Sequence, residues 1–362
     1  MNGLTQLRWQ KSELLDALNL TRAFDTSGPY GDSRVREFVT ESGWYRDLLG
    51  ADNFSKSLCD NPSPFILEET CVPHRRDSSR VSLTGDPRLS ELVSHRFTLT
   101  DLMQTPHLNE RLQLNPHLTK LIDCLSDCDT LLAWIGDKPI SVQPKQAREI
   151  LSELNAALDK FRAVTSDDAF LKEVANQKRA SERKRLGFTR YADKLLSKYE
   201  RLGVVRLDLG YQPNHRDAIN FEKAKRHREA YLALRHSHQL FAQWVGYAWA
   251  VKYGPVKGYH TNLLLFFDGT VRQEDAKLAL SLGELWADKF VEDQGTYFSC
   301  SRTDIEERYH ARVVDAVSID DSRSMEGLCH AINSLTKTDD LVRLRLPGNE
   351  LSFGRGKLRG TS

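Results

Sequence analysis

The chain has 362 residues, 40% of them hydrophobic, and its 51 lysines and arginines almost balance its 50 aspartates and glutamates. The length predicts two domains, each able to bury a hydrophobic core. The near-zero net charge excludes a uniformly basic or acidic protein, so any nucleic-acid or membrane contact has to come from local clusters of charge. No apolar run approaches the roughly 20 residues of a membrane-spanning helix, and we expect a cytoplasmic protein without a membrane partner.

Residues 1–165 are predicted to form a helical accessory region, because short helical periodicities alternate there with proline, glycine and asparagine. Cys124 and Cys128 lie one helical turn apart, with His117 on the same face two turns earlier. A zinc site and simple core packing both stay open for these residues. Packing is favoured, because the chain has no Cys-x-x-Cys pair and free cysteine behaves as a small hydrophobic residue.

Residues 166–201 are predicted to form a basic helical linker. Between Lys178 and Arg201 there are nine basic residues and three acidic ones, a net charge of +6 in 24 residues. Such a run is either the solvated face of a helix or a contact for phosphate groups. The interleaved aromatic residues Phe188, Tyr191 and Tyr199 are compatible with the second interpretation.

Residues 202–356 are predicted to form an α+β domain. We expect strands at 203–211, 245–254, 258–269 and 312–320, helices at 219–244 and 272–290, and an extra helix at 322–340. This β-α-β-β-α-β order is typical of a ferredoxin-like antiparallel sheet, the architecture of RRM-like domains. In that topology the first and third strands are central, and both helices lie on one face.

Alternation along the two central strands predicts a cluster of polar side chains. His260 and Asn262 share one face of the third strand, and Arg206 and Asp208 share one face of the first. If the helices cover the other face, these side chains converge on an open platform, which Lys252 reaches from the neighbouring strand. A ligand site and a set of structural hydrogen bonds are both compatible with this cluster.

The second half of the chain also contains four blocks in a specific order, which together cover about residues 188–356. The blocks are "YADKLLSKYERLGVVRLDLGY", "LFAQWVGYAWAVKYGPVKGYHTNLLLFFDG", "LGELWADKFVEDQGTYFSCSR" and "AINSLTKTDDLVRLRLPGNELSFGRG". In order and spacing they resemble the inovirus-type replication proteins, a family that includes the prophage YagK/YfjJ-like proteins. The resemblance implies an HUH endonuclease fold, which rolling-circle replication initiators of phages and mobile elements use to nick one DNA strand at an origin.

The resemblance also implies a chemistry, in which two histidines and a further acidic or amide ligand hold Mg²⁺ or Mn²⁺ and a tyrosine attacks the scissile phosphate. His260 matches the first histidine, whereas Asn262 stands at the second and Lys252 at the place of an acidic residue. Ser334 stands where the tyrosine would be, and Lys337 matches the lysine that assists it. The resemblance therefore implies a degenerate nicking site, with Mg²⁺ or Mn²⁺ bound at His260 and Asn262 only if activity survives.

The leading hypothesis is a DNA-binding protein of a phage, prophage or satellite element that binds origin, hairpin or single-stranded DNA without efficient nicking. Two alternatives stay open: an active metal-dependent nickase, and a regulatory or host-defence component that reuses the fold and requires a protein partner. Residues 357–362 are expected to form a basic tail. The basic residues expected to contact DNA are Arg206, Lys252, Lys257, Arg343, Arg345, Arg355 and Lys357.

Overall fold

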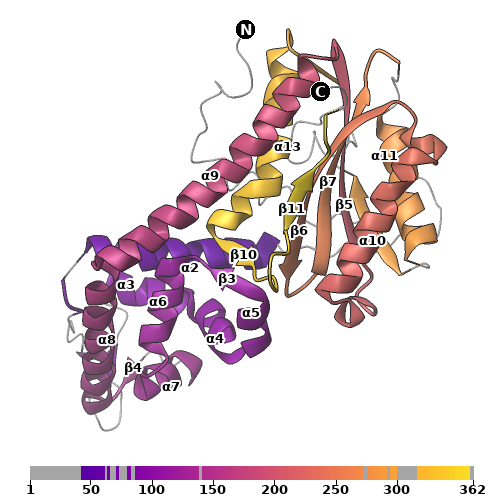
Figure 1. Ribbon diagram of the computed structural model, residues 1–362. Coiled ribbons are helices and arrows are strands. Elements are labelled where there is room, and N and C mark those ends of the chain that lie inside the picture. The colour runs from indigo at the N-terminus through magenta and orange to yellow at the C-terminus, as the bar shows by residue number, and fades with distance from the viewer. Residues whose placement is uncertain are drawn as a thin grey trace. The chain divides into compact units, whose positions relative to one another are not determined.

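The computed structural model describes the chain as two compact units, which are coloured by residue number in Figure 1. The sheet unit contains Ala180–Asp339 and residues 343–358, and the helical unit contains Trp44–Arg179 and Asp340–Val342. Helix α9 (Asp168–Leu196) carries the chain from the helical unit into the sheet unit. The described residues are 42–61, 63–65, 71–72, 80–82, 86–137, 141–271, 275–291, 294–299 and 316–358.

The helical unit consists of helices and short strands. Its helices are α2 (Ser42–Asp60), α3 (Pro87–Ser94), α4 (Arg96–Gln104), α5 (Pro106–Arg111), α6 (Pro116–Leu125), α7 (Asp129–Asp137), α8 (Pro144–Thr165) and the first turns of α9. Proline begins α3, α5, α6 and α8, a position where its missing N–H has no partner to lose. Strands β1 (Cys71–Val72), β2 (Arg80–Ser82) and β4 (Ser141–Val142) form a small antiparallel sheet, and β3 covers Leu112–Leu114. None of the described helices is long and apolar enough to cross a membrane.

Cys124 and Cys128 are buried in the helical unit, where Cys128 Sγ donates to Cys124 O at 3.7 Å. Burial raises the pKa of both thiols, which keeps them protonated. The His117 ring instead contacts the edge of Phe170, with ring centroids 4.9 Å apart. Over the described parts of the chain, no group of three His, Cys, Asp or Glu side chains is placed to hold a metal ion. Core packing is therefore the role that the structure supports for the two cysteines.

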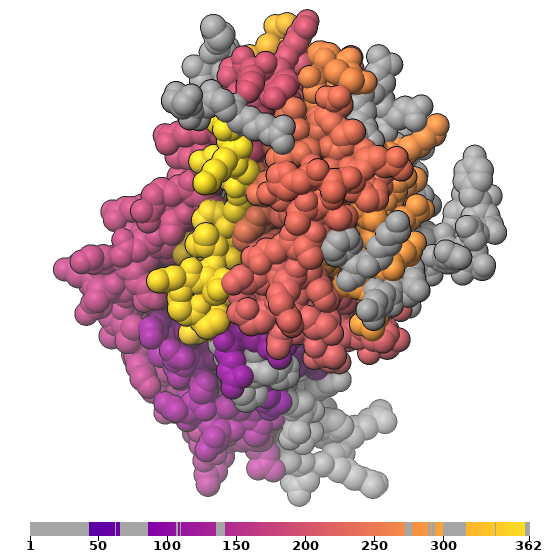
Figure 2. Space-filling view, turned by 45° about the vertical axis from the view of Figure 1, so that its right-hand side comes forward, coloured from indigo at the N-terminus to yellow at the C-terminus, as the bar shows by residue number. Residues whose placement is uncertain are grey.

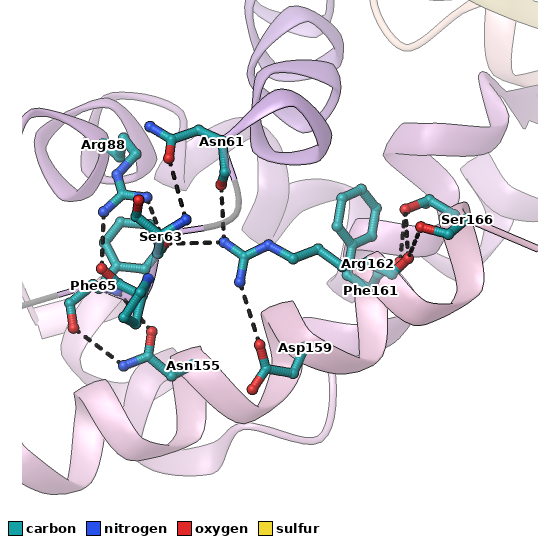
Figure 3. A network of polar contacts seen from close by, with 11 residues as sticks. Asn61, Ser63, Phe65, Arg88, Asn155, Asp159, Phe161, Arg162 and Ser166 are labelled. Atoms are coloured by element: carbon teal, nitrogen blue, oxygen red, sulfur yellow. Dashed lines mark hydrogen bonds and ion pairs between the residues drawn. The ribbon is translucent and has the colours of Figure 1, made fainter.

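Two arginines and an asparagine fix the irregular segment that follows α2 (Figure 3). Arg162 of α8 donates to Ser63 O at 3.2 Å, and Arg88 of α3 donates to the same oxygen at 2.8 Å. Asn155 of α8 bonds the backbone N and O of Phe65, at 2.8 and 3.2 Å. The backbone groups of this segment are thus satisfied by side chains, because they have no strand or helix partner.

The sheet unit is built on an antiparallel sheet whose central strands are β5 (Arg201–Tyr211) and β7 (Gly258–Asp268). The other strands are β6 (Trp244–Gly254), β8 (Gly295–Ser299), β9 (Ala316–Ser318) and β11 (Phe353–Arg355), whereas the short strand β10 (Val342–Leu344) is not part of this sheet. The order is β11-β6-β7-β5-β8, and β9 also pairs with β5. The predicted α+β class is confirmed, and the first and third strands of the domain are central as expected.

The fourth predicted strand is present only in part, and a strand that was not predicted also pairs with β5. The strand beside β5 is Gly295–Ser299, whose Tyr297 and Phe298 suit a pleated, half-buried surface. The predicted strand at 312–320 contributes Ala316–Ser318, which pairs with the opposite end of β5. Of the rest of that prediction, 319–320 form a turn and 312–315 lie outside the described residues.

Helices cover both faces of the sheet (Figure 1). Helices α10 (Phe221–Ala233) and α11 (Asp275–Leu285) lie on one face, and α9 and α13 (Ser322–Thr336) on the other. The core under α9 and α13 includes Tyr191, Leu195, Leu328 and Ile332 from the helices and Val204, Leu264 and Phe266 from the sheet. The expectation of one open face was wrong, because α9 and α13 cover the face that carries the predicted polar residues, and these residues share that face with the apolar ones.

The helix predicted at 219–244 is also shorter than expected. Helix α10 ends at Ala233, and two single turns follow, Leu234–His236 and Gln239–Phe241. His238 Nδ1 accepts from the backbone N–H of Leu240 and begins the second turn. A polar side chain that bonds the backbone in this way competes with continuation of the helix.

Candidate functional site

Five polar side chains lie together on the face of the sheet that α9 and α13 cover. The strand register places Lys252 opposite His260, and Asp208 opposite Asn262. Arg206 precedes Asp208 on the same face of β5, and its Nη2 lies 3.8 Å from Asp208 Oδ2. All five side chains are buried. The structure therefore brings together the residues that strand alternation grouped, but it places them in the interior of the unit.

The Lys252 ammonium connects the sheet to α13. Its Nζ donates a 2.6 Å hydrogen bond to the backbone carbonyl oxygen of Ser334. Burial lowers the pKa of Lys252 to about 8, and the carboxylate of Asp339 opposes this effect. At pH 7 the amine is therefore mostly protonated and holds a positive charge beside His260.

The Ser334 hydroxyl is bonded within its own helix. Its Oγ donates to Ala331 O at 2.6 Å, and the side chain is buried. A carbonyl oxygen is no general base, so this hydrogen bond does not activate the hydroxyl as a nucleophile. Lys337 begins the short turn Lys337–Asp340 that follows α13, and its side chain lies outside the described residues.

His260 is held in one neutral form. Its Nδ1 lies 3.0 Å from Gly258 O, and since a carbonyl oxygen only accepts, Nδ1 carries the proton and Nε2 the lone pair. Burial, aided by the positive charges of Lys257 and Lys252, lowers the pKa of His260 to about 3. The ring is therefore uncharged at neutral pH. On the same face of β7, Asn262 Oδ1 is buried and accepts no hydrogen bond from the described residues.

The two implied metal ligands do not fit a divalent cation in this arrangement. His260 Nε2 and Asn262 Oδ1 supply suitable lone pairs, but Lys252 stands directly opposite His260 on the neighbouring strand. An ammonium about 4 Å from a divalent ion would raise its energy by roughly 8 kcal/mol at an effective dielectric of 20. The charge of Lys252, more than the replacement of a histidine by Asn262, is what opposes metal binding.

A small cavity lies beside this cluster, next to Gly210. It measures about 20 Å³, room for one or two water molecules. Asp208, His260, Thr296 and Lys257 are among its lining residues. A Cβ at position 210 would lie 3.2 Å from Thr296 Oγ1, so the absence of a side chain there leaves this space. The cavity is too small for a nucleotide.

The structure divides the basic residues that were predicted to contact DNA. Arg206 and Lys252 are buried under helices, a position that does not suit contact with a phosphate group. Arg343 is half-buried, and its Nη2 donates to Ser181 Oγ at 2.9 Å, a contact within the sheet unit. Lys257 is half-buried, and the exposed members of the set are Arg345, Arg355 and Lys357.

A basic surface forms where the C-terminal strand runs beside α9. Arg355 of β11 lies over the Tyr191 ring of α9, with Cζ 5.1 Å from the ring centroid, and Lys184 of α9 lies over the Phe353 ring of β11 at 4.3 Å. In Figure 2 the yellow C-terminal segment borders the pink surface of α9. We define the basic surface by its exposed cations, Arg183, Arg190, Lys194, Lys198, Arg355 and Lys357.

The spacing of the basic residues in the sequence is a signal for this surface. Arg183, Arg190 and Lys194 are spaced by seven and four residues, which places them on one side of a helix. This spacing separates them from the other basic residues of the linker, such as Lys184, which is buried and pairs with Asp339 at 2.7 Å.

No protein-family model, no curated protein and no solved structure matches the chain at a significant level.

Proposed function

We propose that the chain is a DNA-binding protein of a phage, prophage or satellite element, related to HUH rolling-circle initiators, that does not nick DNA efficiently. The observation that carries the proposal is the buried Lys252 ammonium, opposite His260 and bonded to Ser334 O at 2.6 Å. Positions that the resemblance assigns to the metal and the nucleophile are thus close in space. The hydrogen bond from the Lys252 ammonium to Ser334 O now joins these positions and places a positive charge between them. This arrangement supports descent from a nicking enzyme that has lost its metal-dependent step.

In this proposal the basic surface, and not the sheet, contacts DNA. Its six exposed cations come from two segments that lie side by side. Lysine and arginine side chains that neutralise phosphates release bound counterions, so such binding weakens steeply as salt rises. The near-neutral charge of the whole chain does not oppose this role, because the relevant field is local.

The active-nickase alternative has less support. The Ser334 hydroxyl is buried and donates to Ala331 O, so a base would first have to displace that hydrogen bond. Tyr297, another hydroxyl-bearing residue of the sheet, sits on β8 with its ring against Gly283 of α11, where a Cβ would lie 2.0 Å from a ring carbon. That position is on the α11 side of the sheet and is thus remote from Lys252.

The proposal is tested by incubating the full chain with a labelled hairpin oligonucleotide and MnCl₂, then resolving the mixture on native and denaturing gels. We expect a shifted band on the native gel and no covalent adduct on the denaturing gel. The double variant Arg190→Gln, Lys194→Gln should reduce the slope of log K against log salt by about 1.4 for single-stranded DNA.

A matched control is the double variant Lys145→Gln, Arg148→Gln, which removes one exposed lysine and one exposed arginine from α8 in the helical unit. This control should leave the affinity and the salt slope unchanged. A covalent adduct would refute the loss of nicking, and equal effects of the two double variants would refute the assignment of the basic surface.

A further inference from the structure

A groove lies on the α10 side of the sheet unit, away from the cluster around Lys252. It is formed by α10, strand β6 and the segment 347–351, and it measures about 560 Å³. This volume is within the range of roughly 300–1,000 Å³ that is typical of small-molecule sites. Its lining includes the indole of Trp249 and the side chains of Glu222, Lys225, Glu229 and Leu351.

Arg228 of α10 gives this groove unused hydrogen-bonding capacity. Its guanidinium stacks on Trp249, with Cζ 3.7 Å from the ring centroid, and the side chain is only 4% exposed. Its Nη2 donates to Glu229 Oε1 at 3.2 Å, whereas Nε and Nη1 have no acceptor within the described chain. A buried N–H group without an acceptor destabilises the protein, so a ligand that supplies an acceptor here removes that cost when it binds.

The charge of the groove disfavours strongly anionic ligands. Three carboxylates line it, against the two cations Lys225 and Arg228. Glu350 is bonded by Lys225 at 2.6 Å across the groove, while Glu222 and Glu229 are exposed. These carboxylates accept hydrogen bonds from ligand N–H groups and repel a phosphate. The preferred ligand is thus uncharged and flat, with an acceptor edge and a donor edge.

We propose that this groove binds one unstacked nucleobase, and that guanine matches it best. Guanine presents the acceptors O6 and N7 on one edge, which suit an arginine, and N–H donors on another edge, which suit a carboxylate. The free N–H groups of Arg228 lie in the plane of the guanidinium, so the base meets Arg228 edge-on, and Trp249, whose ring Arg228 covers, holds the guanidinium in place. A base of single-stranded DNA and a free nucleoside share this chemistry, and only the DNA source rests on the proposed function.

The test measures binding to the full chain by isothermal titration calorimetry. The ligands are the four deoxynucleosides and short single-stranded oligonucleotides that contain or lack guanine. Glu229→Gln keeps the shape of an exposed side chain, and Trp249→Leu removes the ring that holds the Arg228 guanidinium in place. Each variant should weaken deoxyguanosine binding about tenfold or more, in line with the loss of a bidentate contact to a base edge.

The control is the double variant Arg190→Gln, Lys194→Gln on the basic surface. It should weaken the binding of oligonucleotides and leave deoxyguanosine binding unchanged. Deoxyguanosine binding that Glu229→Gln abolishes, in a protein that binds no oligonucleotide, would support the groove as a site for a free nucleoside and would overturn the DNA-binding function.

The proposal is overturned if no deoxynucleoside binds and Glu229→Gln leaves guanine-containing oligonucleotides bound as tightly as before. The DNA-binding function would survive that result if the basic-surface variant still weakened oligonucleotide binding. The failure of the groove and the failure of the proposed function are therefore distinguishable.

Discussion

Replacing Lys252 by methionine tests the buried charge on which the proposed function depends. In the folded protein, burial lowers the pKa of Lys252 to about 8 from its usual value of 10.5. Between these two values the unfolded chain binds more protons than the folded chain, so stability rises with pH across this window. Wild-type protein should gain stability between pH 8 and 10.5, and Lys252→Met should lack this gain.

The size of this change in the free energy of unfolding follows from the same two pKa values. A shift of about 2.5 pKa units corresponds to roughly 3 kcal/mol at 1.36 kcal/mol per unit, of which about 1 kcal/mol appears between pH 7 and 9. Methionine removes this penalty but leaves Ser334 O without its donor, which costs about 1–3 kcal/mol at every pH. The two effects nearly cancel at pH 7. At pH 9 the variant should be less stable, relative to wild type, by about 1 kcal/mol more than at pH 7.

The assay is urea unfolding of both proteins at pH 7, 8 and 9, followed by circular dichroism. Lys145→Met is the matched control, because the Lys145 side chain is 87% exposed. The free energy of unfolding of Lys145→Met should differ from that of wild type by the same amount at every pH. The difference in free energy of unfolding between Lys252→Met and wild type could also prove to be the same at pH 7, 8 and 9. That result would mean that the ammonium is solvated in the folded protein, and it would refute the account of a charge fixed beside His260.

Two further predictions concern packing. Gly246→Ala should destabilise the sheet unit, because a Cβ there would lie 2.5 Å from the Tyr191 hydroxyl oxygen. Gly187→Ala should be neutral or stabilising, because a Cβ at position 187 would have no atom within 4 Å. Equal melting temperatures for these two variants would contradict the packing of α9 on β6. Asn155→Ala removes the hydrogen bonds to both backbone groups of Phe65 and should lower the free energy of unfolding by about 1–3 kcal/mol. Urea denaturation checks this value, and an unchanged midpoint would show that water replaces the asparagine without loss.

The local elements of this protein could be predicted from its sequence. The three long strands were placed within two residues of their observed ends, since runs such as Gly258–Asp268 combine β-branched, leucine and aromatic residues with glycine at the turns. The grouping of His260 with Asn262 follows from the two-residue period of a strand. These features depend only on neighbours in the chain.

Tertiary structure alone decided what covers the polar cluster. Val204, Leu264 and Phe266 share the face of Arg206 and Asn262, so these strands are apolar on both sides and indicate two covered faces. Which helices cover each face is set by burial between segments far apart in sequence. The bond from Lys252 to the carbonyl oxygen of Ser334 joins residues 82 positions apart, and no local pattern contains that information. Whether a polar side chain in a strand meets a ligand or the protein interior is therefore determined by long-range packing.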